Sequence, residues 1–175
     1  MKKIVIVCGS IAGLIVAAML LITAAIYHSS GNFDNGVLIG YTSMLIAFSL
    51  IFVGIKNFRD KHNSGVISFG KAFKIGILIT LIASTFYVVT WLIDYYYFIP
   101  DFGEKYAAHM IEKARAGGAS AEEIAKQTKE MTNFAEMYKN PFFNAMLTYT
   151  EILPVGLLVT LVASLILKRK VRPAM

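Results

Sequence analysis

Four long apolar runs are the feature of this sequence that most restricts its fold. They are Ile4–Tyr27, Val37–Ile55, Ile75–Ile93 and Phe142–Leu167. Because a bilayer core about 30 Å thick needs roughly 20 apolar residues per helix, each run can cross it as a helix. With 57% hydrophobic residues, the chain is also too apolar for an ordinary soluble domain. We therefore expect an all-α, polytopic protein with a single membrane domain over residues 1–175.

The basic residues predict the orientation of these helices. Most of the 17 Lys and Arg residues fall in three clusters, which are Lys2 and Lys3, then Lys56, Arg59, Lys61, Lys71 and Lys74, and finally Lys168, Arg169, Lys170 and Arg172. The positive-inside rule places such clusters in the cytoplasm. This predicts that both termini and the middle loop are cytoplasmic. It also makes membrane lipid the expected partner of this charge, rather than nucleic acid.

The first run has two interpretations. Met1-Lys2-Lys3, an apolar stretch and the small residues at 23–25 together resemble a cleaved signal peptide. The run is longer than a usual signal core, which favours an uncleaved span. Gly9 and Gly13 lie four residues apart in it, a spacing that lets another helix approach closely, so we expect a packing face there.

Two polar segments accompany the spans. Residues 64–74 carry Val66, Phe69 and Phe73 at helical spacing with lysines at another angle, which predicts a short interfacial helix at the inner membrane surface. It is either a basic anchor or a site for anionic lipid or a partner. Residues 101–139 predict an extracytoplasmic helical hairpin, which a protein partner could bind. Within it, Ser120 and Glu123 have the spacing of a capping box.

The last run carries polar residues where apolar ones are expected. Asn144, Thr148 and Glu151 follow at steps of four and three, which places them on one helix side. Pro154 removes an amide from the same helix and frees a carbonyl near the acid. A carboxyl in a span is costly, so Glu151 should face protein or water. These residues could form a proton or cation site, or Glu151 could be a neutral group that joins helices by hydrogen bonds.

Asp94 is the other acid associated with a span. It follows Trp91 and precedes the tyrosines at 95–97, which are typical of an aromatic belt at the outer interface. A carboxyl at that boundary reaches water at low cost. We therefore interpret Asp94 as a boundary residue, with a functional acid as the alternative.

No sequence motif predicts an enzyme or a cofactor. The chain has no nucleophile motif and no phosphate-binding glycine loop, and His109 has no second His or Cys at metal-ligand spacing. We expect a non-enzymatic membrane scaffold or interaction protein. The alternative is proton- or ion-coupled translocation of a small solute by Glu151. Four helices make a small pore unless the chain oligomerises, so a homo-oligomer is a further possible partner state.

Four stretches of the sequence resemble a bacterial membrane-protein family known as domain of unknown function 4199. They are GYTSMLIAFSLIFVGIKNFRD from Gly40, GVISFGKAFKIG from Gly65, YAAHMIEKARAGGASAEEI from Tyr106, and MYKNPFFNAMLTYTEILPVGLLVTLVASLILKRK from Met137. The resemblance implies four membrane helices with an extracytoplasmic insertion before the last. It also implies the bacterial cytoplasmic (inner) membrane as the location. The family has no established activity, so it assigns no functional residues.

Overall fold

The structure is a computed structural model that describes residues 1–30 and 36–169. In these two ranges the chain forms six helices, listed in order as α1 (Lys2–Ser30), α2 (Gly36–His62), α3 (Phe69–Tyr97), α4 (Phe102–Ala116), α5 (Ala121–Tyr138) and α6 (Pro141–Leu167). Four of them, α1, α2, α3 and α6, are long and apolar enough to cross a membrane. The all-helical prediction with four spans is thereby confirmed. The turn after the first span (31–35) and the basic residues Lys170 and Arg172 lie outside the described residues.

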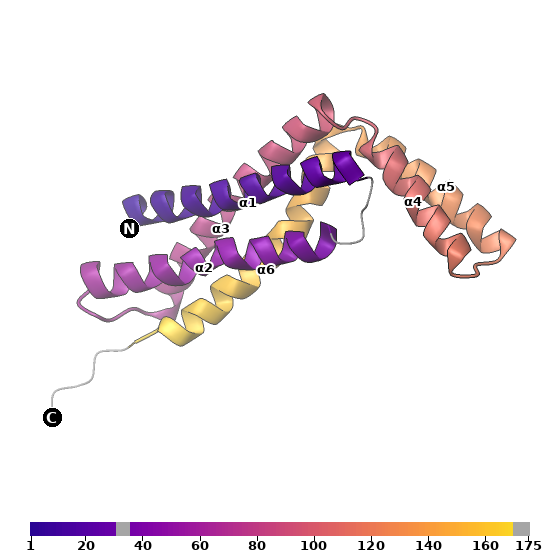
Figure 1. Ribbon diagram of the computed structural model, residues 1–175. Coiled ribbons are helices and arrows are strands. Elements are labelled where there is room, and N and C mark those ends of the chain that lie inside the picture. Colours follow the sequence, from indigo (N-terminus) through magenta and orange to yellow (C-terminus); the bar gives the residue numbers. More distant parts are fainter. Residues whose placement is uncertain (31–35, 170–175) are drawn as a thin grey trace.

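The four long helices form one bundle, and the two short helices extend from it. Helix α1 packs against α2 and α3, and α6 packs against α2 and α3. Fully buried side chains such as Met44, Phe48, Ile51 and Ile79 fill the space between them. Figure 1 shows the start of α1, the end of α6 and the α2–α3 connection at one end of the bundle, which we call the terminal end. The α4–α5 hairpin projects from the opposite end, which we call the hairpin end.

Side-chain caps fix where three of the helices begin. The Ser120 hydroxyl accepts from the Glu123 amide at 3.3 Å, and the Glu123 carboxylate accepts from the Ser120 amide at 2.8 Å, so the predicted capping box is confirmed. The Ser120 amide and hydroxyl also lower the pKa of the Glu123 carboxyl. The Ser68 hydroxyl accepts from the Lys71 amide at 3.4 Å at the start of α3. Asn140 Oδ1 accepts from the Phe142 amide at 2.9 Å and begins α6 directly after the hairpin.

Glycines allow the helices of the bundle to approach closely. A Cβ on Gly9 would lie 2.9 Å from Ile82 Cβ, and one on Gly13 would lie 2.7 Å from Phe86 Cγ, so the predicted packing face of α1 lies against α3. A second close approach joins α3 and α6. There the Thr80 hydroxyl donates to the Gly156 carbonyl at 3.3 Å, and a Cβ on Gly156 would collide with the Thr80 side chain.

The expected interfacial helix over residues 64–74 does not form as a separate element. Helix α3 begins at Phe69 and continues without a break to Tyr97. The preceding residues turn sharply instead, with Ser64 and Gly65 both at positive φ (52° and 75°). The helical spacing of the apolar residues in this segment therefore belongs to the first turns of α3, and the periodicity alone could not locate the boundary.

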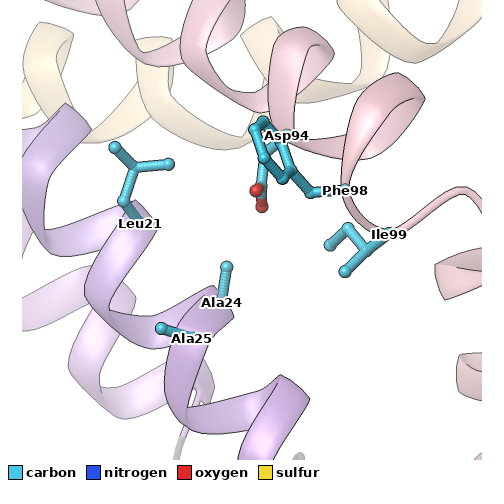
Figure 2. Close-up of a pocket in the computed structure, with 6 residues that line it drawn as sticks. All are labelled: Leu21, Ala24, Ala25, Asp94, Phe98 and Ile99. Carbon is cyan, nitrogen blue, oxygen red and sulfur yellow. The ribbon is translucent and has the colours of Figure 1, made fainter.

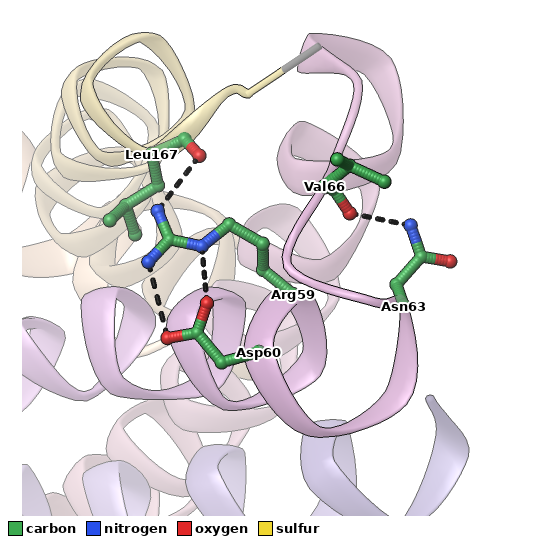
Figure 3. Close-up of polar contacts among 5 residues, drawn as sticks. All are labelled: Arg59, Asp60, Asn63, Val66 and Leu167. Carbon is green, nitrogen blue, oxygen red and sulfur yellow. Dashed lines mark hydrogen bonds and ion pairs between the residues drawn. The ribbon is translucent and has the colours of Figure 1, made fainter. Parts of the chain in front are cut away.

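The α2–α3 connection is tied to the end of α6. Ile67 and Arg169 exchange two backbone hydrogen bonds, each 2.9 Å long. Figure 3 shows Arg59 at this end of the bundle, with Nη1 donating to the Leu167 carbonyl at 3.3 Å and Nε donating to Asp60 at 2.7 Å. The residues that close the terminal end of the bundle therefore come from α2, from the connection and from the last turn of α6.

Candidate functional site

A cavity of about 350 Å³ lies at the hairpin end of the bundle. All six helices contribute to its lining, with Thr23 from α1, Val37 from α2, Tyr87 from α3, Phe102 from α4, Phe134 from α5 and Glu151 from α6. This is where the four spans meet the base of the hairpin. The cavity is the natural candidate for a functional site, since it combines apolar walls with a few polar groups.

Glu151 is the acid of this cavity. Its side chain is exposed to the cavity space and is not enclosed in the helix packing. Tyr87 of α3 lines the same cavity, with its hydroxyl close to the carboxyl group of Glu151. The carboxyl thus lies in the lining of a cavity that all six helices share.

Asn144 and Thr148 do not accompany Glu151 into the cavity. Both are buried, at 0% and 4% exposed, and they bond within the helix packing. Asn144 Oδ1 accepts from the Trp91 indole at 3.0 Å and Asn144 Nδ2 donates to the Tyr138 carbonyl at 3.4 Å, while the Thr148 hydroxyl donates to the Asn144 carbonyl at 2.8 Å. The Asn144 side chain therefore joins α6 to α3 and α5. Thr148 bonds to Asn144 within α6. Both side chains stabilise the helix packing.

Pro154 lies inside α6 and outside the cavity lining. Its side chain is exposed, and the helix continues through it to Leu167. The missing amide of Pro154 still frees the Thr150 carbonyl one turn earlier. The structure thus places the freed carbonyl near the position of Glu151 along the helix, without bringing Pro154 itself to the site.

Asp94 lies in a different pocket. The sequence predicted that its carboxyl reaches water, but the structure buries it. Its side chain is only 6% exposed, because the end of α1 covers it. Figure 2 shows the carboxyl directed into a small pocket between Leu21 and Ala24 of α1 and Phe98 beyond α3. Among the described residues, Asp94 Oδ2 has no hydrogen-bond partner. The sequence placed Asp94 correctly at the end of α3 but could not show that α1 extends over it.

Aromatic rings form the wall of the cavity on the hairpin side. The Trp91 and Phe102 rings meet edge to face with centroids 5.0 Å apart, Phe102 and Tyr106 stack at 6.0 Å, and Phe134 lies 5.4 Å from Tyr138. Burial raises the pKa of the Tyr138 hydroxyl, which keeps it protonated. In the sequence, Phe102 and Tyr106 lie four residues apart, a spacing that places them on one helix face. Nothing in that pattern indicated that this face meets Trp91 and Glu151 across the chain.

The site offers no cluster of metal-ligating side chains. No group of three or more His, Cys, Asp or Glu residues that could hold a metal ion occurs in residues 1–30 and 36–169. Glu151 and Asp94, the two acids expected from the sequence, line separate pockets. What the cavity can provide is a carboxyl group, hydroxyl groups and aromatic rings.

Four helices that are long and apolar enough to cross a membrane indicate a multi-pass α-helical membrane protein. The chain belongs to the family DUF4199, described as proteins of unknown function, which matches residues 8–169. The resemblance found in the four sequence stretches is thereby confirmed. No curated protein and no solved structure matches the chain.

Proposed function

We propose that this protein is a membrane-anchored interaction protein that presents the α4–α5 hairpin to a protein partner outside the cytoplasm. The proposed location is the bacterial inner membrane, with both termini and the α2–α3 connection in the cytoplasm. The basic residues near the terminal end support this orientation through the positive-inside rule. The observation that carries the proposal is a hairpin that projects from the bundle and is fixed at its base (Figure 1).

Hydrogen bonds hold the base of the hairpin against the spans. The Trp91 indole of α3 donates to the Tyr138 hydroxyl at 2.8 Å, and the Tyr96 hydroxyl donates to the Lys139 carbonyl at 2.9 Å. Within the base of the hairpin, Gly103 of α4 packs against Ala135 of α5. A rigid base gives the projecting helices a defined direction, and a defined direction reduces the entropy cost of binding a partner.

The remainder of the hairpin is suited to protein contact. Its charged side chains are exposed and of both signs, for example Glu112, Lys113, Glu122 and Lys126. Such a mixed surface does not select anionic lipid or nucleic acid, both of which favour a basic surface. Its apolar residues, such as Met131, are only partly buried between the two helices. A partner helix or sheet could cover what the hairpin leaves open.

Photo-crosslinking in cells tests this proposal. A photoreactive residue at Glu122 or Lys129, both exposed on α5, should give a discrete protein adduct. The same residue at Leu158, which is 63% exposed on α6, should give only lipid adducts. If the hairpin positions give no adduct, or the same adducts as Leu158, the interaction role is contradicted.

A labelling control checks the orientation in the same cells. Cys8 is the single native cysteine, so a Cys8→Ala background allows new cysteines to be labelled selectively. Glu122→Cys should react with a membrane-impermeant maleimide in intact cells. Lys61→Cys should react only after the membrane is permeabilised. The reverse pattern would place the hairpin in the cytoplasm.

The second candidate is translocation of a proton or ion by Glu151, favoured by its exposure to the cavity. Between Glu151 and the terminal end, the interior is filled by fully buried apolar side chains, among them Phe48, Ile79 and Ile152. Translocation would therefore require a second conformation. Proteoliposomes should show a proton flux that Glu151→Gln abolishes. A wild-type flux equal to that of empty liposomes would exclude this candidate.

A further inference from the structure

The geometry points to a binding site for an alkylammonium group in the cavity at the hairpin end, with the Glu151 carboxylate as counter-ion and aromatic faces as walls. The inference goes beyond the presentation of the hairpin, because it assigns a ligand class to the space beneath it. The ammonium could belong to a free organic amine or to a lipid headgroup. Both sources share the chemistry that the cavity recognises.

The charge of the cavity supports a cationic ligand. Among the described residues that line it, Glu151 is the acid, and no Lys, Arg or His joins it. A carboxylate removed from bulk water is costly unless it is paired or neutralised. The Tyr87 hydroxyl, which lies near Glu151 in the cavity lining, is neutral and cannot supply a positive charge. A ligand cation would supply the missing counter-charge.

The aromatic lining distinguishes an organic cation from a bare metal ion. Six aromatic side chains line the cavity, which are Tyr87, Trp91, Phe102, Tyr106, Phe134 and Tyr138. Ring faces attract cations, and sets of such rings are the usual recognition element for quaternary ammonium groups. A metal ion would need several oxygen ligands instead, and Glu151 alone cannot provide them.

The orientation of Trp91 supports the same conclusion. Its indole N–H is already engaged, since it donates to the Tyr138 hydroxyl at 2.8 Å and to Asn144 Oδ1 at 3.0 Å. The residue therefore offers the cavity its ring and not a hydrogen-bond donor. The volume of about 350 Å³ falls in the range of small-molecule sites, so it accommodates an ammonium with apolar substituents.

Fluorescence titration tests the site directly. Trp91 is the single tryptophan of the chain and lines the cavity, so its emission reports on occupancy. We expect choline, added to the full chain in an uncharged detergent, to change this emission in a saturable manner. Its neutral isostere, 3,3-dimethylbutan-1-ol, should bind at least about tenfold more weakly, because it lacks the charge that ring faces attract. Equal binding of the two compounds, or no saturable response to choline, would overturn the inference.

Matched variants identify the counter-ion. Glu151→Gln should weaken choline binding about tenfold or more and leave the binding of the neutral isostere unchanged, because it removes only the charge pair. Glu130→Gln, the same substitution at an exposed position of α5 outside the cavity lining, should bind choline like the wild type. Should Glu151→Gln fail to fold, Phe134→Leu provides a second test, because it keeps an apolar wall and removes one ring. A Phe134→Leu variant or a folded Glu151→Gln variant with wild-type choline affinity would contradict the site.

Lipid composition separates the two sources of the ammonium group. In nanodiscs of phosphatidylcholine, a headgroup site would already be occupied, so the response to added choline should be lost. In phosphatidylglycerol nanodiscs, which lack an ammonium headgroup, the response should remain. Equal responses in the two lipids would identify a free amine as the ligand.

Discussion

Gly156→Ala should lower the melting temperature of the purified protein by several degrees. A Cβ at this position would collide with the Thr80 side chain and would lie 2.9 Å from Phe48 Cζ. The Thr80 hydroxyl cannot simply rotate away, because it bonds the Gly156 carbonyl at 3.3 Å and lies 3.2 Å from the Thr160 hydroxyl. Overpacking of this kind costs about 1–3 kcal/mol. We expect the melting temperature in detergent to fall by roughly 2–12 °C.

Gly40→Ala is the matched control for this measurement. Gly40 is also a helical glycine in an apolar span, yet a Cβ there would meet no heavy atom within 4 Å. Alanine favours helix over glycine by roughly 0.5–1 kcal/mol, so the control should be neutral or slightly stabilising. If both variants melt alike, the close approach of α3 and α6 at Gly156 is not as tight as the structure indicates.

Asn144→Leu should loosen the junction between the spans and the hairpin. The side chain is fully buried and bonds both the Trp91 indole, at 3.0 Å, and the Tyr138 carbonyl, at 3.4 Å. Leucine of similar size would leave the Tyr138 carbonyl without this donor, and a buried polar group left unpaired costs about 1–3 kcal/mol. We expect a lower melting temperature and a shifted Trp91 emission, together with faster tryptic cleavage after Lys139 at the base of the hairpin.

Asn133→Leu serves as the control for Asn144→Leu. Asn133 is exposed on α5, so the same substitution there removes no buried hydrogen bond. Its melting temperature and its rate of cleavage after Lys139 should match the wild type. A rate of cleavage that is equally fast in both variants would show that hydrophobicity in this region, and not the Asn144 bonds, controls access to the junction.

The polar residues of α6 illustrate how far the sequence predicts the candidate site. Their spacing predicts one helix side for Asn144, Thr148 and Glu151, but only Asn144 and Thr148 are buried in the helix packing. Helical periodicity gives the angle of a residue around its own helix, but it does not say which neighbour stands at that angle. Glu151 lines the cavity, whereas Asn144 and Thr148 are enclosed in the helix packing. This difference depends on the positions of α3 and α5.

Asp94 is a second residue whose neighbours the sequence could not predict. Its position at the end of the third span was clear from the sequence, and so was its aromatic neighbourhood. Its burial was not, because the cover comes from Leu21 and Ala24, which lie far earlier in the chain. The packing of α1 along α3, together with Phe98 and Ile99, removes this carboxyl from solvent.

The sequence by itself determined the elements that depend on local chemistry. Runs of apolar residues long enough for a bilayer made four helices, Gly9 and Gly13 made a flat face on the first, and the Ser120–Glu123 pair fixed the start of α5. The tertiary structure alone decided which polar groups share a space. Glu151, Trp91 and Phe102 come from three helices and meet at one cavity. Contacts between distant segments depend on how whole helix faces fit together, and no short stretch of sequence encodes that fit.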